Sequence, residues 1–148
     1  MSRFLQCPDC HGIALVIYGE EDAGCGTYDK LHANTTDAAL EKHLPVVEVK
    51  KDVVQAKVGA DDHPMDEDHY ITWVYLETTR GGSLRVLKPG DQPQVEFRLS
   101  DGERPLAVYE YCNRMGSGRR SWPRSRKAAV CRYRAIRLSS SGTKMLPP

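Results

Sequence analysis

Hydrophobic and polar residues alternate over several short stretches in the middle of the chain. Alternation with a period of two, in stretches rich in Val, Ile, Tyr and Trp, is typical of β-strands with one buried face. Turn-forming sequences such as RGG, KPGDQP and SDGERP separate the stretches, at the spacing found in small antiparallel sandwiches. The pattern predicts a mainly β, immunoglobulin-like, seven-stranded antiparallel β-sandwich with Trp73 and Phe97 in its core. The stretches recognised are 46–50, 53–59, 70–78, 83–87, 94–99 and 106–112.

The region before these strands has a different pattern. Residues 1–33 contain three of the five cysteines, Cys7, Cys10 and Cys25, and little apolar periodicity. So short a segment buries little core, so we expect a bound metal to hold it together as a small knuckle. Residues 34–42 offer capping residues followed by good helix formers, which predicts one or two helical turns before Pro45.

The composition narrows the class of protein. The 148 residues are 40% hydrophobic and 28% charged, which is typical of one globular domain with a small appendage. No apolar run approaches the roughly 20 residues that span a bilayer, and the N-terminus lacks the features of a secretory signal. We therefore expect a cytoplasmic protein whose cysteines are metal ligands or nucleophiles rather than disulfides.

The charges are divided unevenly along the chain. Residues 1–113 contain all 20 acidic residues and 11 of the 21 basic ones, whereas residues 114–148 contain 10 basic residues and no acidic one. One explanation is a basic arm that binds nucleic acid or a membrane surface, because clustered cations release counterions from phosphates. The apolar residues of this tail, however, follow neither a helical nor an alternating spacing.

Three histidines lie in or beside predicted loops of the β region. His43 precedes the first strand, and His63 and His69 flank a short loop in which Pro64 restricts His63 to an extended backbone. Such a loop can direct both imidazoles toward one point, and imidazole suits iron, copper and zinc. The acidic residues between positions 61 and 68 form a solvated face or orient the imidazoles.

Cys112 ends the last predicted strand. In a sandwich the strand ends of both sheets approach one another, so a thiolate here can meet the three imidazoles. The alternative is that Cys112 is a small buried hydrophobe, a common role of cysteine in a strand.

Several separate motifs then resemble the desulfoferrodoxin family of superoxide reductases, over essentially all of residues 1–114. They are TTDAALEKHLPVVE, KVGADDHPMDEDHYITWVYLET, LKPG and YEYCN, in the order and spacing of the family. The resemblance implies an oxidoreductase that reduces superoxide to hydrogen peroxide at a mononuclear iron. In that family four imidazoles and an axial thiolate hold the iron and leave a sixth position open.

Carried over to this chain, the resemblance assigns roles to six residues. His43, His63 and His69 would be equatorial ligands and Cys112 the axial one. Lys42 would attract superoxide and help to deliver a proton, and Glu41 would occupy the open position of the resting ferric state. The resemblance also implies a small electron donor such as a rubredoxin and a homodimer. We expect neither a membrane nor a nucleic acid as partner.

The fourth imidazole of the family is missing. The family reads Cys-Asn-x-His-Gly, whereas this chain has Met115 at the position of the histidine. A thioether is a softer ligand and does not reproduce the reach of an imidazole. This departure leaves an alternative function open, that of a decayed, non-catalytic member that binds zinc or iron.

The N-terminal segment also departs from its desulforedoxin-like counterpart. That counterpart holds iron with four thiolates, from a Cys-x-x-Cys pair and a Cys-Cys pair, but here Gly24 precedes Cys25. Cys7, Cys10 and Cys25 therefore form a second, incomplete site. His11 or His32 would complete a set that favours zinc over iron.

A shifted reading frame would explain both Met115 and the basic tail. Residues 115–120 can be encoded ATG GGC TCT GGA AGG CGN, and starting one base earlier, at a C, gives CAT GGG CTC TGG AAG GCN. That translates as His-Gly-Leu-Trp-Lys-Ala, which resembles the usual ending of the family. The hypothesis divides the chain into a knuckle (1–33), an iron-binding β-sandwich (34–114) and an out-of-frame, disordered tail (115–148). Sequencing the gene across codons 112–120 tests it.

Overall fold

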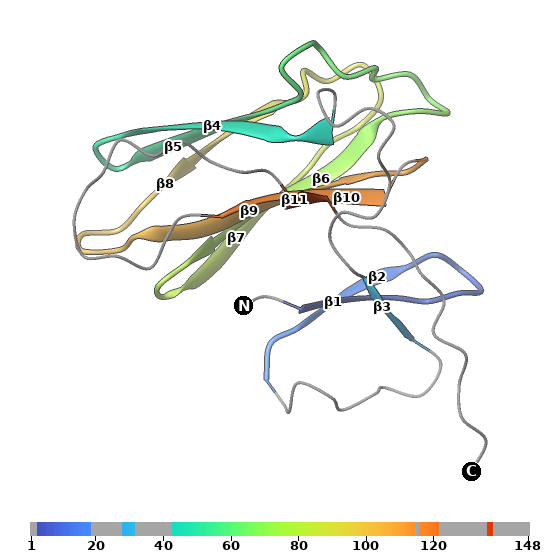
Figure 1. The fold of residues 1–148 in the computed structure, drawn as a ribbon, viewed down its shortest axis with the longest axis horizontal. Helices are drawn as coiled ribbons and strands as arrows, with labels where there is room; N and C mark the ends of the chain where they lie inside the picture. Colours follow the sequence, from blue (N-terminus) through green and yellow to red (C-terminus); the bar gives the residue numbers. More distant parts are fainter. Residues whose placement is uncertain (1–2, 19–27, 32–42, 115, 122–135, 138–148) are drawn as a thin grey trace.

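The computed structural model describes residues 3–18, 28–31, 43–114, 116–121 and 136–137, and the statements below concern these residues. The helical turns expected at 34–42 lie outside them. Two antiparallel sheets form a β-sandwich, and a third, smaller sheet lies beside it (Figure 1).

The first sheet of the sandwich has three strands in the order β4-β5-β8. Their pairing is regular, with Pro45 opposite Val58 and Val54 opposite Phe97. The strands are β4 (Pro45–Lys50), β5 (Val53–Val58) and β8 (Gln94–Arg98).

The second sheet has five strands in the order β11-β10-β9-β6-β7. Its centre is the long β6/β9 pair, in which Ile71 lies opposite Cys112. The strands are β6 (Ile71–Thr78), β7 (Gly81–Val86), β9 (Pro105–Cys112), β10 (Gly116–Ser121) and β11 (Ile136–Arg137). All six stretches recognised in the sequence are therefore strands, with ends that differ by at most two residues, and the predicted β-sandwich is confirmed. Its two sheets have eight strands in the described residues instead of the seven expected, because β10 and β11 follow Cys112.

The core lies between the two sheets and is built by alternation. Along β5 every second side chain is buried, and Phe97 of β8 is fully buried, as expected. Burying one large apolar side chain contributes roughly 1.5–3 kcal/mol, so this layer accounts for much of the stability. The buried cluster comprises Val54, Ala56, Val58, Ile71, Val74, Leu76, Phe97, Val108 and Cys112.

Strand β10 corrects the expectation for the tail. Residues 116–121 pair with β9 in a continuous antiparallel register, from Gly116 opposite Cys112 to Ser121 opposite Ala107. The expected disorder is thus wrong for these residues. The sequence GSGRRS has no alternation, because the strand is held by backbone hydrogen bonds rather than by apolar side chains. The frameshift itself stays a prediction.

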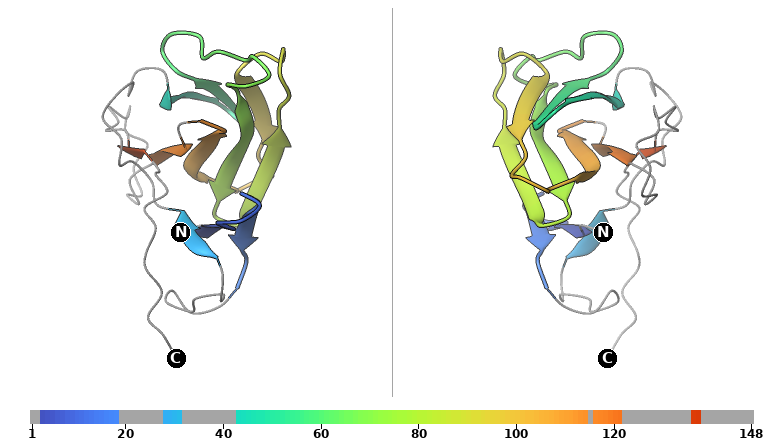
Figure 2. Two further views of the ribbon diagram at one scale, coloured as in Figure 1. Left: turned by 90° about the vertical axis from the view of Figure 1, so that its right-hand side faces the viewer. Right: turned by 90° about the vertical axis from the view of Figure 1, so that its left-hand side faces the viewer.

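The N-terminal residues form a third sheet in the order β2-β1-β3. Its strands are β1 (Arg3–Gln6), β2 (Ile13–Val16) and β3 (Asp29–Leu31). We call this sheet, with the turn that joins β1 to β2, the N-terminal module. It lies against the five-stranded sheet, on the side away from β4, β5 and β8 (Figure 2).

Aromatic packing joins the N-terminal module to the sandwich. The ring of Phe4 lies 4.9 Å from that of Trp73 and 5.2 Å from that of Tyr109, between ring centroids. The sequence predicted that Trp73 lies in the sandwich core. Trp73 instead lies on the outer face of β6, against the N-terminal module. The expectation of a knuckle held by a bound metal left out this contribution, because Phe4 and Leu31 are buried against the sandwich.

A hydrogen bond also joins the N-terminal module to the sandwich, and its contribution to stability can be tested by removing the acceptor. Gln6 Nε2 donates to the hydroxyl of Tyr111 over 2.8 Å. We expect Tyr111→Phe to lower the free energy of unfolding by about 0.5–1.5 kcal/mol, since the partly buried amide loses its acceptor. Urea denaturation measures this change. Tyr18→Phe is the control, because Tyr18 is 95% exposed; equal effects of the two substitutions would contradict the expectation.

Candidate metal centre

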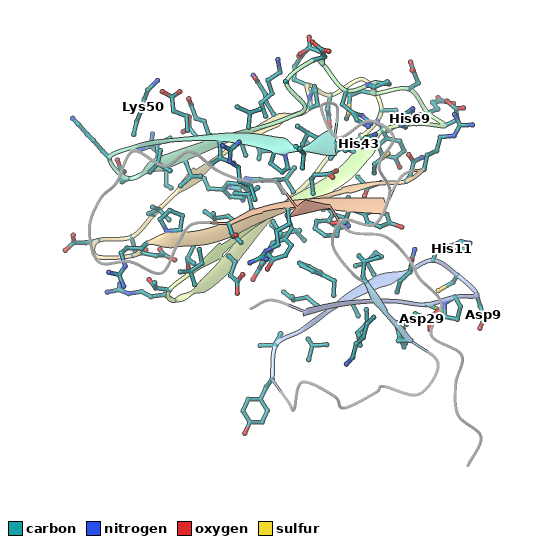
Figure 3. The ribbon with its side chains drawn as sticks, in the orientation of Figure 1. Asp9, His11, Asp29, His43, Lys50 and His69 are labelled. Atoms are coloured by element: carbon teal, nitrogen blue, oxygen red, sulfur yellow. The ribbon has the colours of Figure 1, made fainter. Side chains whose placement is uncertain are left out.

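The candidate site lies at one end of the sandwich, where strands of both sheets begin or end. His43 stands just before β4, and the amide of Gly59 donates to the carbonyl of Leu44 over 3.0 Å, which joins the start of β4 to the end of β5. His63 and His69 lie in the loop between β5 and β6, and Cys112 is the last residue of β9. His43 and His69 share this end, away from His11 of the N-terminal module (Figure 3).

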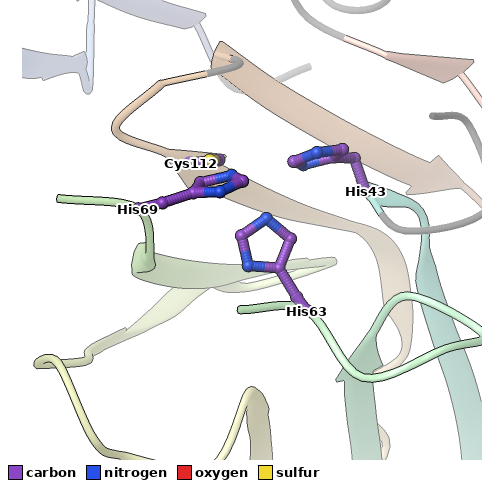
Figure 4. Close-up of side chains that lie close together, drawn as sticks. All are labelled: His43, His63, His69 and Cys112. Atoms are coloured by element: carbon purple, nitrogen blue, oxygen red, sulfur yellow. The ribbon is translucent and has the colours of Figure 1, made fainter. Parts of the chain in front are cut away.

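The four side chains converge on one point (Figure 4). One ligand atom from each of His43, His63, His69 and Cys112 lies within 4.8 Å of all the others. The ring of His63 is nearly perpendicular to those of His43 and His69, at centroid distances of 4.5 and 4.8 Å. In the part of the chain that the structure describes, no other group of three or more histidine, cysteine or acidic side chains converges in this way.

Burial distinguishes this cluster from a surface accumulation of polar groups. Cys112 is fully buried, and His43 and His63 are 4% and 3% exposed, whereas His69 is half-buried. Buried polar groups are costly without partners. The Nε2 atom of His69 is buried and makes no hydrogen bond to the described residues, which fits a nitrogen reserved for a ligand.

The hydrogen bond of His63 fixes which of its nitrogens faces a ligand. Its Nδ1 lies 2.6 Å from the carbonyl oxygen of Pro64. Because a carbonyl can only accept, Nδ1 carries the proton and Nε2 keeps its lone pair. A backbone carbonyl holding the second nitrogen is a common arrangement of metal-bound histidine.

The donor set fits a transition metal. Imidazole and thiolate suit iron, zinc or copper, whereas magnesium and calcium require oxygen donors. A metal ion also supplies the positive charge that a fully buried thiolate needs. His43, His63, His69 and Cys112 would therefore hold such an ion together.

Strand β10 supports His43, which the sequence did not indicate. A Cβ atom at position 118 would collide with the carbonyl oxygen of His43 and with the carboxylate of Glu110. Arg120 Nη1 also donates to the carbonyl of Pro45 over 3.2 Å. The absence of a side chain at Gly118 therefore lets β10 pack closely beside the segment that carries His43.

This close approach predicts the effect of adding one methyl group. We expect Gly118→Ala to lower the free energy of unfolding by about 1–3 kcal/mol, the usual cost of overpacking, and to weaken metal binding by displacing His43. Thermal unfolding and zinc titration measure the two effects. Ser121→Ala on the same strand serves as the control; an unchanged zinc affinity of Gly118→Ala would contradict the role of β10.

The second predicted site is described only in part. Cys7 and Cys10 lie in the turn after β1, where the amide of Cys7 donates to the carbonyl of Gly12 over 2.9 Å. The pKa of the Cys7 thiol is lowered because the backbone amide and the thiol of Cys10 hydrogen-bond to it. The structure thus brings these two cysteines together. Cys25 and His32 lie outside the described residues, as do Glu41, Lys42 and Met115, which the sequence resemblance associates with the main site.

Comparison with known proteins decides the family. The family model of desulfoferrodoxin matches residues 35–119, more than half of the chain. This chain belongs to the desulfoferrodoxin family. The match extends past residue 114, the boundary expected from the sequence, into β10.

Individual relatives agree with this assignment. The desulfoferrodoxin of Syntrophotalea carbinolica is 42% identical over 114 residues, which cover 75% of this chain and 89% of that protein. The desulfoferrodoxin of Nitratidesulfovibrio vulgaris is 36% identical over the same length, with the same coverage. Among solved structures, the superoxide reductase of Treponema pallidum superposes with a TM-score of 0.66 and 34% identity, covering 79% of this chain and 94% of that one. The desulfoferrodoxin fold and family predicted from the sequence are therefore confirmed.

One further property concerns membranes. Within the described ranges, no helix combines the length and the hydropathy needed to cross a bilayer.

Proposed function

We propose that this desulfoferrodoxin is a superoxide reductase, with His43, His63, His69 and Cys112 as ligands of a mononuclear iron. The observation that carries the proposal is the convergence of these four donors within 4.8 Å. The structural likeness to a superoxide reductase supports it. Bound iron would supply the single electron that, with two protons, converts superoxide into hydrogen peroxide.

The protein side chains set the charge of the site. Three neutral imidazoles and one thiolate compensate only one of the two charges of a ferrous ion, so the site keeps a net charge of about +1. That charge attracts an anionic substrate. Cys112 is fully buried at the end of β9, so the sheet shields its sulfur from water and keeps it on the inner side of the site.

Two further residues belong to the proposal through their place in the chain. Lys42 directly precedes His43, so its ammonium group would stand at the rim, where it attracts superoxide and passes a proton through water to the product. Glu41 would occupy the open position between turnovers. A small electron donor such as a rubredoxin, a homodimeric assembly, a cytoplasmic location and a second iron or zinc ion in the N-terminal module complete the proposal.

A second candidate function rests on one departure from the family. Met115 stands where the fourth imidazole is expected, and Cys25 lacks a neighbouring cysteine. These changes favour a non-catalytic member that retains zinc or iron for structure alone.

Pulse radiolysis separates the two candidates. The iron-loaded protein is mixed with a reductant and exposed to a pulse of superoxide, and the decay and the products are followed. A superoxide reductase accelerates the decay and forms hydrogen peroxide without dioxygen, whereas a dismutase would release dioxygen. Decay at the rate of the buffer would instead support the non-catalytic alternative.

A further inference from the structure

Asn113, the residue after Cys112, makes hydrogen bonds to both sides of His69. Its Oδ1 accepts from the backbone amide of Tyr70 over 2.9 Å, and its Nδ2 donates to the carbonyl of Asp68 over 3.2 Å. Its own amide donates to the carbonyl of Tyr70 over 3.2 Å. The side chain of Asn113 therefore holds the residues immediately before and after His69, which carries the third imidazole.

The physical basis is that a carboxamide has the same donor and acceptor groups as a peptide bond. The β6/β9 ladder ends where Ile71 lies opposite Cys112. Beyond that step, the side chain of Asn113 offers an acceptor to Tyr70 and a donor to Asp68, as a neighbouring strand would do. The backbone bond from Asn113 to Tyr70 and the two bonds of the Asn113 side chain together continue the ladder past the Ile71/Cys112 pair, up to His69.

We propose that Asn113 is a positioning residue that holds the His69 imidazole in register with the Cys112 sulfur. The inference rests on the proposed metal centre and adds the device that joins two of its ligands. Such a device is needed because His69 stands in a loop with exposed acidic residues on its N-terminal side, and its Nε2 makes no hydrogen bond to the described residues. The aim of the ring therefore depends on the backbone.

Other contacts of this loop do not replace Asn113. Asp66 and His69 exchange two backbone hydrogen bonds of 3.1 Å, which shape the turn. The amide of Gly90 donates to the backbone carbonyl of Met65 over 2.8 Å. These contacts hold the loop together or fix its start, but none of them reaches β9. The ion pair between Arg114 and Asp68 does link the two segments, at 3.6 Å, but both side chains are largely exposed, and exposed pairs contribute little.

The first test uses metal binding in the full chain. Cobalt(II) is titrated into wild type, Asn113→Ala and Asn113→Asp, and both affinity and the visible spectrum are recorded. We expect both substitutions to weaken binding roughly 10- to 100-fold, as loss of a residue that orients a ligand generally does. The thiolate-to-cobalt band should persist while the ligand-field bands change, since Cys112 remains bound and His69 does not. Arg114→Ala is the control and should behave as wild type.

The second test needs no metal. In the metal-free protein, amide exchange of Tyr70 should be about tenfold faster in Asn113→Ala, which removes the acceptor. Exchange should stay slow in Asn113→Asp, which keeps Oδ1 and loses only the donor to Asp68. Unchanged Tyr70 exchange in the alanine variant, or unchanged cobalt affinity and bands in both variants, would overturn the inference.

The two proposals fail in different ways. If wild type binds cobalt through Cys112 but does not reduce superoxide, the proposed function fails and the role of Asn113 stands. A wild type that binds no cobalt removes the metal centre, and with it the positioning role of Asn113, even where Tyr70 exchange responds to the alanine substitution.

Discussion

Cys112→Ser is expected to abolish the thiolate-to-iron absorption band and to remove superoxide reduction. Serine fills nearly the same volume, so the fully buried position at the end of β9 is conserved in shape. A hydroxyl, however, is not deprotonated at neutral pH and is a poor ligand for a ferrous ion beside three imidazoles. Loss of a residue that only orients a metal ligand generally lowers metal affinity by about tenfold or more. Loss of the ligand itself is a larger change, so we expect iron affinity to fall by at least about tenfold. Metal analysis after dialysis and the visible spectrum measure the outcome.

The matched control for this substitution lies in the N-terminal module. Cys10→Ser changes an exposed cysteine outside the cluster. It should leave the absorption band and the superoxide reaction of the sandwich unchanged. A Cys112→Ser protein that keeps stoichiometric iron and its absorption band would show that another residue supplies the thiolate.

Met115→His is expected to produce the opposite effect, a gain of iron affinity. Residue 115 directly precedes Gly116, the register partner of Cys112. The imidazole would supply the fourth nitrogen that the family carries at this place. We expect affinity to rise by about tenfold or more, because an imidazole binds ferrous iron better than a thioether does. Competition with a chelator of known affinity measures the change.

Arg114→His is the control for position. It introduces the same imidazole one residue earlier, where the present side chain points toward Asp68. No gain in iron affinity is expected from it. Equal affinities for Met115→His and wild type would mean that the site already has its full set of ligands, and would remove the main argument for a shifted frame.

The sequence predicted the strands and the members of the cluster for physical reasons that are easy to follow. Alternation marks β5 because one face of that strand is buried, whereas β6 is covered on both faces and stood out by its run of β-branched and aromatic residues. His63 and His69 stood out because a short loop holds both, and Cys112 because it ends a strand that meets the other sheet. Their service as iron ligands stays a prediction.

Other features left no pattern that sequence reasoning could find. Strand β10 is held by backbone pairing and by the absence of a side chain at Gly118, neither of which produces alternation. Trp73 faces outward because the N-terminal module covers it, and that contact joins residues far apart in the chain. The carboxamide of Asn113 makes the hydrogen bonds that a peptide group would make. Such a role leaves no pattern in the sequence, where only the position next to Cys112 distinguishes this asparagine.

The distribution of the four donors has a consequence for biosynthesis. The first donor stands before β4 and the last ends β9, so a growing polypeptide on the ribosome has no complete ion pocket until most of the domain has been translated. Iron would therefore be acquired after synthesis. Once bound, it would link residues near both ends of the domain and so reduce the conformational freedom of the unfolded chain. Cells starved of iron would accumulate a looser polypeptide that proteases degrade more readily.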